Sequence, residues 1–219
     1  MTLPRRRPSR NLQHPCFART YSVASRMLDV RGGAGHRRDL LAPLTGRVVE
    51  VGAGNGLNFV HYPSTVTGVI AVEPERRLRT EAQHAAARAQ VPVTIVSARA
   101  EQLPAPDDHF DGAVVSLVLC SFPEPGEALA ELRRVVRPGG IVRFYEHVRS
   151  TRRAVGLMQD AITPVWSRLA GGCHLNRDAV AAVARAGLEV MEVDRFPFAG
   201  VSHVAGTAVV PDAGTPPSS

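Results

Sequence analysis

The sequence predicts an α/β fold in which a parallel sheet carries helices on both faces. Short runs rich in β-branched residues alternate with segments of helical periodicity, which is the pattern of successive β-α-β units. Turn residues bound each run, and one of these turns is a loop of alternating glycines. A chain of 219 residues has the length of one domain with a sizeable core.

Helices come first in the predicted order. Residues 1–15 are rich in Pro, Arg and Ser, which is the composition of disordered chain. From Phe17 to Leu44, apolar residues recur at helical spacing, and the glycines of 32–35 divide this segment into two helices. We therefore expect residues 1–46 to form a basic tail followed by helices that pack on the core.

Strands and helices then alternate along the rest of the chain. A longer helical region covers about 151–186, and two last apolar runs, joined by a short turn that contains proline, have the pattern of an antiparallel pair. The composition of 211–219 predicts a disordered tail. The expected strands cover 47–51, 65–72, 91–97, 110–119, 140–148, 188–196 and 201–210, and the helices between the first five of them cover 73–89 and 125–136.

The positive charge of the chain is concentrated near its N-terminus. Residues 1–47 contain ten arginines and two acids, a net charge of +8, whereas the remaining residues have a net charge of −2. A nucleic-acid-binding face needs its cations on the folded surface. We therefore expect no nucleic-acid partner, and at most a weak contact of the basic segment with anionic surfaces.

The sequence also lacks a membrane span, a signal peptide and the cysteine spacing of a disulfide or metal site. No apolar stretch approaches the roughly 20 residues of a membrane span, and the first residues lack the apolar segment of a signal peptide. Cys16, Cys120 and Cys173 are scattered, without disulfide or metal-ligand spacing. These features predict a cytoplasmic protein with no metal site, in which Cys120 packs as a small apolar residue.

The glycine loop after the first strand predicts a ligand. Alternating Gly52, Gly54 and Gly56 let a ligand approach the main chain where a Cβ would clash, and a helix that begins near Gly56 would direct free N–H groups at it. A dinucleotide loop has a third glycine where this chain has Leu57. Glu50, two residues before the loop, would repel a diphosphate. S-adenosylmethionine carries an ammonium and a sulfonium and no phosphate, so the charge favours this cofactor.

Glu73 ends the second expected strand. An acid at this position can accept hydrogen bonds from both ribose hydroxyls of a nucleoside, which suits either S-adenosylmethionine or NAD. An NAD(P)-dependent oxidoreductase therefore remains an alternative at this point, and so does a partner protein that binds the cofactor without catalysis.

Four segments occur in an order and spacing that resemble the class I S-adenosylmethionine-dependent methyltransferases: VVEVGAGNG, VIAVEPE, SARAEQLPAPDDHFDGAVVSLVLCSF and LRRVVRPGG. The pieces LVLCS, EHV and GCHLNR are similar to the subgroup that includes the alkyl thiol methyltransferases of animals and many bacterial relatives. The resemblance implies a methyltransferase domain over 47–210 with a Rossmann-like, doubly wound, seven-stranded sheet. Six strands would be parallel and the last antiparallel.

The same resemblance implies which residues bind the cofactor. Glu50 and the three glycines match the loop around the methionine moiety, and Glu73 matches the ribose acid. Arg99 departs from the family, because many relatives have an acid there that accepts from the adenine amino group. The positions implied to contact S-adenosylmethionine are Glu50, Gly52, Gly54, Gly56, Asn58, Glu73, Ala100, Glu101, Ser116 and Leu117.

The chemistry of methyl transfer makes modest demands on side chains, because the protein mainly aligns the nucleophile with the methyl group and excludes water. A thiol with a pKa of about 8.5 yields thiolate in a modest local field, so a dedicated base is not required. The catalytic candidates are His147, which could take a proton or only structure the sheet edge, and Glu146 beside it. Residues 155–170 have the pattern of a substrate-shaping helix or of ordinary core.

The expected function is methyl transfer from S-adenosylmethionine to a small molecule. A thiol or another apolar nucleophile is favoured as the acceptor. A quinone- or phospholipid-type methyltransferase is the alternative within the same family, because the same loops would serve it.

Overall fold

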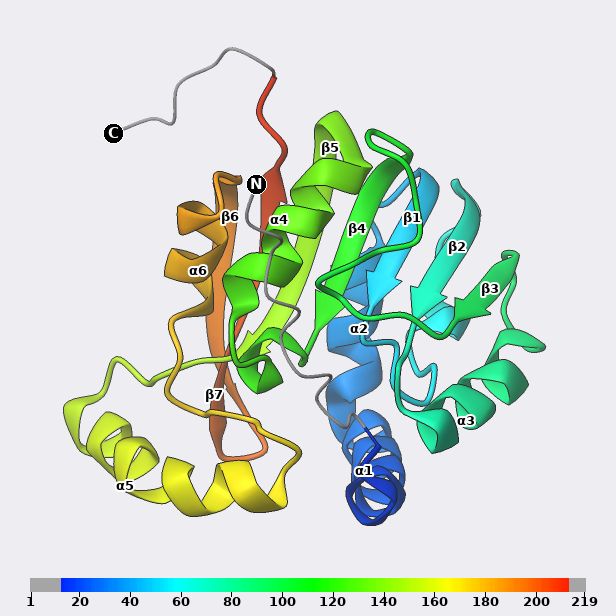
Figure 1. Cartoon of the computed structure of the whole chain (residues 1–219). Helices are drawn as coiled ribbons and strands as arrows, with labels where there is room; N and C mark the ends of the chain where they lie inside the picture. The colour runs from blue at the N-terminus through cyan, green and yellow to red at the C-terminus, as the bar shows by residue number, and fades with distance from the viewer. Residues whose placement is uncertain (1–12, 213–219) are drawn as a thin grey trace, which may run out of the picture.

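The sheet has the expected seven strands in a doubly wound order. The computed structural model describes residues 13–212, so the predicted disorder at 1–15 and 211–219 lies almost entirely outside the described residues. The strand order is β3-β2-β1-β4-β5-β7-β6 (Figure 1). The strands are β1 (Gly46–Val51), β2 (Val66–Val72), β3 (Val93–Val96), β4 (Phe110–Ser116), β5 (Val136–His147), β6 (Glu189–Phe198) and β7 (Val201–Val209).

The parallel part of the sheet has five strands, so the prediction of six was wrong. β3, β2, β1, β4 and β5 pair in parallel, whereas β7 pairs antiparallel with both β5 and β6. Within residues 13–212, β6 forms the edge of the sheet and pairs with β7 alone. Its two-residue connection, Ala199 and Gly200, has positive φ at both positions (50° and 81°), which is the geometry of a tight hairpin rather than of the long crossover that parallel pairing requires.

Helices cover both faces of the sheet, as predicted. α2 and α3 pack on one face and α4 and α6 on the other (Figure 1). The predicted division of the first helical segment is confirmed, because Gly32 adopts a φ of 125° between α1 and α2. The helices are α1 (Pro15–Leu28), α2 (Ala34–Leu41), α3 (Arg76–Ala86), α4 (Pro125–Val135), α5 (Arg153–Leu169) and α6 (Ala179–Arg185).

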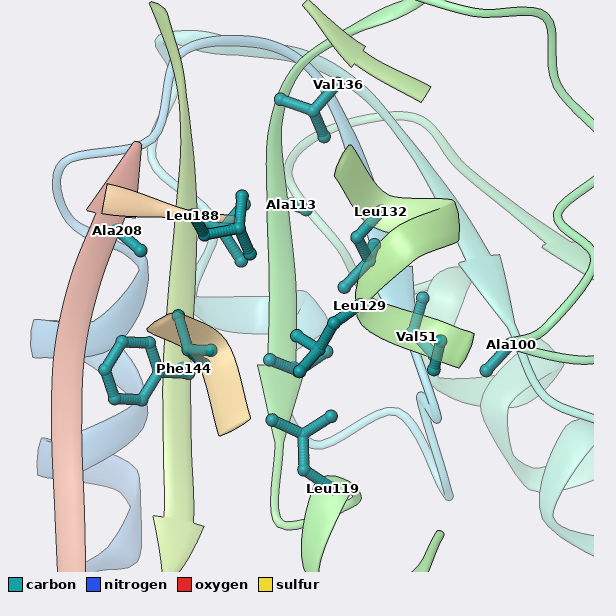
Figure 2. Close-up of a cluster of buried hydrophobic side chains, with 14 of the residues drawn as sticks. Val51, Ala100, Ala113, Leu119, Leu129, Leu132, Val136, Phe144, Leu188 and Ala208 are labelled. Carbon is teal, nitrogen blue, oxygen red and sulfur yellow. The ribbon is translucent and has the colours of Figure 1, made fainter. Parts of the chain in front are cut away.

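Two apolar cores sandwich the sheet. Side chains alternate between the faces of a strand, so Val49 and Val51 of β1 join the core under α4 and α6, while Val48 joins the core under α2 and α3. Figure 2 shows the first core, in which Leu129 of α4 and Phe144 of β5 lie over the sheet. The central strands are apolar on both faces because both faces are covered.

The expected helix after the glycine loop is absent. The segment forms only a 3₁₀ turn, Phe59–His61. Tyr62 follows in an extended conformation (φ −63°, ψ 129°), because the residue before Pro63 is driven out of the helical region. The loop therefore has no long helix whose N-terminus could face a ligand.

The carboxyl ends of β1, β4 and β5 point to one edge of the sheet. Figure 1 shows α1 and α5 at this edge, beyond the arrowheads. Ligands of open α/β sheets bind at this edge, where the strand order reverses between β1 and β4. Within 13–212, no helix is long and apolar enough to span a membrane.

Candidate active site

The glycine loop follows β1 and requires glycine at each of the three positions. Gly52, Gly54 and Gly56 have φ values of 71°, 58° and 78°, in the left-handed region. A Cβ on Gly52 would lie 2.4 Å from Cγ2 of Val118, and one on Gly56 would lie 2.7 Å from the ring of Phe59. The loop is thus shaped so that its main chain, rather than side chains, faces the edge of the sheet.

Glu73 lies against this loop, so the structure brings these two predicted elements together. Its Oε2 accepts a hydrogen bond from the amide of Gly54 at 2.8 Å, and its Oε1 accepts one from the amide of Glu75 at 2.8 Å. Burial raises the pKa of Glu73 above its usual value. The carboxylate therefore joins the tips of β1 and β2.

Glu50 points away from the loop surface, beneath it. Because side chains alternate along β1, Glu50 shares the α2 face with Val48, and only 2% of it is exposed. Its carboxylate accepts from Nδ2 of Asn58 at 2.8 Å and from the hydroxyl of Tyr62 at 2.7 Å. Nη1 of Arg37 donates to Oδ1 of Asn58 at 2.8 Å. Glu50 and Asn58 are therefore brought together as predicted, but as parts of a buried network.

Burial raises the pKa of Glu50 to about 7, and the hydrogen bonds from Tyr62 and Asn58 oppose the rise. The sequence did not identify Arg37 or Tyr62. Arg37 lies on α2 and Glu50 on β1. Their separation in the sequence gives no sign that Arg37 is linked to Glu50 through Asn58.

The segment expected to border adenine combines a buried alanine with a partly exposed ion pair. Ala100 is buried and packs in the core under α4. Glu101 forms an ion pair with Nε of Arg99 at 3.5 Å. Many relatives have an acid at the position of Arg99 that accepts from the adenine amino group. Glu101 does not replace that acid, because its charge is paired with Arg99.

The end of β4 contains a buried hydroxyl without a partner and a strained residue. Among the described residues, Oγ of Ser116 is buried without a hydrogen-bond partner, and the same is true of Oγ of Ser22 on α1. Leu117 adopts a φ of 57°, which is unfavourable for a side chain with a Cβ. Strained backbone and unsatisfied polar atoms are characteristic of ligand sites.

α1 covers the glycine loop. The ring of Tyr21 would lie 3.3 Å from a Cβ placed on Gly54, and Nδ2 of Asn55 donates to Oγ of Ser25 at 3.0 Å. Burial raises the pKa of Tyr21. The structure thus places the N-terminal helix α1 directly over the glycine loop, in contact with Gly54 and Asn55.

Glu146 is completely buried and holds the loop after β4. Its Oε1 accepts from the amides of Val118 and Leu119, each at 2.9 Å, and its Oε2 accepts from the amide of Cys120 at 3.1 Å. Burial raises its pKa, against the effect of these three hydrogen bonds. The carboxylate of this catalytic candidate is therefore directed at the backbone and not into a cavity.

His147 faces two cysteines. Its Nδ1 lies 3.5 Å from Sγ of Cys120 and 3.4 Å from Sγ of Cys173, and the two sulfurs are 3.5 Å apart. The hydrogen bond between the thiols and the neighbouring His147 lower the pKa of Cys173, whereas that hydrogen bond and burial raise the pKa of Cys120. The cysteines are 53 residues apart in sequence, so their spacing gave no sign of this cluster.

A cavity of about 260 Å³ adjoins His147 and Cys120 at this edge of the sheet. Apolar and charged groups share its wall. Its other lining residues are Leu119, Pro123, Pro125, Arg177, Asp178, Ala179, Ala182 and Arg185.

The matching part of the chain corresponds to known methyltransferases. The Methyltransferase domain family matches residues 49–144. Thiol S-methyltransferase TMT1B of Rattus norvegicus is 30% identical over 171 residues, which are 74% of this chain and 70% of that protein. Human TMT1B is 30% identical over 154 residues, 68% of this chain and 63% of that protein, so the chain spans less than two thirds of this relative. Phosphatidylethanolamine N-methyltransferase of Cereibacter sphaeroides is 29% identical over 150 residues, 67% of this chain and 72% of that protein.

Solved structures agree on the fold. An S-adenosylmethionine dependent methyltransferase from Mesorhizobium loti superimposes with a TM-score of 0.62 at 16% identity, over 83% of this chain and 99% of that chain. Such low identity supports the fold alone, whereas the sequence relatives and the matched domain identify the family. From its seven-stranded sheet, its glycine loop and a 30% identical relative that it covers to 70%, this chain belongs to the class I S-adenosylmethionine-dependent methyltransferases.

Proposed function

We propose that the methyl acceptor is a small molecule with a soft nucleophile, most simply a thiol. The observation that carries this proposal is the cavity of about 260 Å³ next to the end of β4, which is lined by Leu119, Cys120 and His147. Its size suits a small molecule, and its sulfur and imidazole groups suit a soft acceptor. The 30% identity to a thiol S-methyltransferase supports the same acceptor class.

The described residues fit S-adenosylmethionine, which supplies a methyl carbon activated by the sulfonium when it is bound. Three glycines with positive φ form a loop with no side chains of its own at these positions, and a Cβ there would crowd Val118, Tyr21 or Phe59. Among the residues that the structure describes, each oxygen of Glu73 accepts only one backbone amide and keeps a second lone pair that can accept from a ribose hydroxyl. The unpartnered hydroxyl of Ser116 offers a further polar contact. We assign the same binding function to the main chain of Leu117 and Ala100.

Two residues take different roles from those implied by the resemblance. Glu50, with both oxygens bonded to Asn58 and Tyr62, acts in this proposal beneath the loop, which it holds in shape through Asn58. Glu146 is a positioning residue that fixes the amides of Val118, Leu119 and Cys120. His147 remains the side chain of the pair that faces the acceptor cavity.

The first two helices belong to the same functional unit in this proposal. Leu40 and Leu41 of α2 are part of the core, and α1 covers the glycine loop. Residues 13–46 thus complete the domain that begins at β1 rather than forming a separate module.

A calorimetric titration with S-adenosylhomocysteine tests the cofactor site. Gly54→Ala adds a Cβ 3.3 Å from Tyr21 at a φ of 58°, and we expect binding to weaken by about tenfold or more. Gly126→Ala in α4 is the matched control, because a Cβ there meets nothing within 4 Å. Unchanged affinity in Gly54→Ala would remove this loop from the proposed site, and tight binding of NADH without S-adenosylhomocysteine would overturn the choice of cofactor.

A methylation assay with labelled cofactor tests the acceptor. We expect transfer to small thiols and little transfer to phenols or amines of similar size. Transfer to amines alone would reject the thiol proposal while leaving the cofactor site intact.

A lipid acceptor is the second candidate, favoured by the surface of α5. Its exposed apolar side chains include Leu157, Val165 and Leu169, at 56%, 60% and 73% exposure, and the similarity to a phosphatidylethanolamine N-methyltransferase points the same way. Labelling of phosphatidylethanolamine in vesicles, but not of soluble thiols, would favour this candidate.

A further inference from the structure

Cys120, His147 and Cys173 come together from three separate segments at the edge of the sheet. We propose that these three side chains bind one thiophilic divalent cation of the zinc class and leave a fourth coordination position open toward the acceptor cavity. Neither the family match nor the relatives assign such a site. The proposal departs from the expectation of no metal, which rested on sequence spacing alone.

The distances suit a tetrahedral ion. Zinc–sulfur bonds of about 2.3 Å and a zinc–nitrogen bond of about 2.0 Å, at tetrahedral angles, place two sulfurs about 3.8 Å apart and sulfur and nitrogen about 3.5 Å apart. The three observed separations are 3.5 Å between the sulfurs and 3.5 Å and 3.4 Å from sulfur to Nδ1. A disulfide would require the sulfurs to close to about 2.05 Å, a far larger movement.

Burial and charge also suit a cation. Cys120 and Cys173 are 2% and 6% exposed. Two thiolates, a neutral imidazole and a divalent ion have no net charge, so the loaded cluster avoids the cost of an uncompensated buried charge. The neighbouring carboxylate of Glu146 is engaged by three amides, which leaves the sulfurs and the imidazole as the available ligands.

The backbone holds the ligands in place before any ion binds. The amide of His174 donates to the carbonyl of Cys120 at 2.9 Å, which ties the two cysteine segments together. The amide of Cys120 is fixed by Glu146 at 3.1 Å. His147 ends β5 opposite His203 of β7, so its main chain is held by the sheet.

The fourth position connects the site with the acceptor, and this step alone rests on the proposed function. Cys120 and His147 line the cavity of about 260 Å³, and three protein ligands with one open position form the usual arrangement of catalytic zinc. A thiol that coordinates there loses its proton to solvent, because coordinated thiols are deprotonated. His147 then serves as a ligand rather than as a base.

A cobalt titration tests the metal site. The full chain, kept reduced with a phosphine and freed of metal by a chelator, is titrated with Co²⁺ in place of Zn²⁺. We expect one equivalent to bind, with sulfur-to-cobalt charge-transfer absorption in the near ultraviolet and the visible bands of tetrahedral cobalt, and we expect Zn²⁺ to displace it. Absence of the sulfur absorption in the wild-type chain would overturn the proposal.

Cysteine variants assign the ligands. Cys173→Ser and Cys120→Ser should lose the charge-transfer absorption, and His147→Gln should weaken cobalt binding. Cys16→Ser is the matched control. Cys16 is the remaining one of the three cysteines, and it lies exposed on α1, outside the cluster. An unchanged spectrum in Cys173→Ser would overturn the assignment.

The unfolding temperature of the wild-type chain with and without Zn²⁺ tests the metal site without relying on variants of the ligands, which could fail to fold. Zn²⁺ should raise the unfolding temperature of the metal-free wild-type chain and of Cys16→Ser, since an ion that binds only the folded state stabilises it. No rise in either would contradict the site.

A small thiol tests the open position. Mercaptoethanol should intensify the sulfur-to-cobalt absorption of the loaded chain, and its S-methyl analogue should not. Equal spectra with both compounds would overturn the open position. Failure of the proposed function is seen separately, as absent binding of S-adenosylhomocysteine or absent methyl transfer, and would leave the cobalt spectrum unchanged.

Discussion

Glu50 illustrates how a single side chain can keep its place and change its role. The sequence placed an acid before the glycine loop, and its expected partner was a positively charged ligand. In the structure, strand alternation turns the carboxylate to the α2 face, where Asn58 and Tyr62 bond to it. The cation Arg37 is linked to it through Asn58 and lowers its pKa less than burial raises it, so the charge of Glu50 is only partly compensated.

This burial predicts a dependence of stability on pH. The pKa of Glu50 rises from 4.5 to about 7 on folding, so folded protein binds more protons than unfolded protein between these values. The wild-type chain should therefore lose stability relative to Glu50→Gln as the pH rises from about 4.5 to about 7, by at most about 3 kcal/mol. The glutamine can accept from Asn58 and donate to the Tyr62 hydroxyl.

Urea unfolding at pH 5 and pH 8 measures this difference. Glu189→Gln, on the exposed start of β6, removes the same charge without burial and should follow the pH dependence of the wild-type chain. If the free energy of unfolding of Glu50→Gln changes with pH as that of the wild-type chain does, ionisation of the buried carboxylate does not lower stability.

At the residue scale, the sequence predicted what local spacing encodes. The positions of the three glycines and Glu73 could be predicted because they lie at or just after strand ends, where the order of elements fixes them, whereas their contact with a cofactor stays a prediction. Cys173 next to Cys120, and Tyr62 bonded to Glu50, depend on how distant segments meet. No single-chain pattern encodes such contacts.

At the scale of elements, strands were recognised from β-branched runs and their approximate limits were right. The helix expected after Gly56 was wrong, because Pro63 drives Tyr62 out of the helical region and the segment forms only a 3₁₀ turn. α1 was foreseen as a helix that packs on the core, but helical periodicity alone does not indicate that it lies over the glycine loop.

α1 is shallowly packed, and this predicts a response to cofactor. Its buried residues are Ala18, Ser22 and Ser25, all small, so local opening should be easy. If S-adenosylhomocysteine binds only beneath a closed α1, amide exchange in Pro15–Leu28 should slow by about tenfold at a ligand concentration ten times the Kd.

Hydrogen–deuterium exchange with mass spectrometry measures this slowing. α6 is the internal control, because it packs under the opposite face of the sheet through Val183. Equal exchange of α1 with and without ligand would show that the helix is no lid, and equal slowing of α6 would indicate global stabilisation instead.

For the whole molecule, the sheet order joins the two halves of the site. The glycine loop follows β1, Cys120 follows β4 and His147 ends β5, so the reversal of strand order between β1 and β4 brings them to one edge. The antiparallel β6–β7 hairpin completes the sheet beside β5 and supports His147 through its pairing with His203. The integrity of this hairpin should therefore limit the stability of the whole domain.

Gly206 in β7 is the position at which we expect a substitution in the hairpin to lower the stability of the domain most. A Cβ there would lie 2.4 Å from Cζ of Phe144 in β5 and 2.5 Å from the carbonyl of Glu192 in β6. Phe144 is fully buried, so it cannot move aside, and backbone cannot yield without breaking the pairing. Gly206→Ala should thus lower the free energy of unfolding by about 1–3 kcal/mol or more.

Gly68→Ala in β2 provides the comparison, because a Cβ there has its nearest neighbour at 3.9 Å. Alanine loses less backbone entropy than glycine on folding, so this variant should be as stable as the wild-type chain or slightly more. Urea unfolding of both variants gives the two free energies. Equal stability of Gly206→Ala and Gly68→Ala would mean that β5 and β6 can separate at little cost, and the hairpin would then not be what holds His147 at the edge of the sheet.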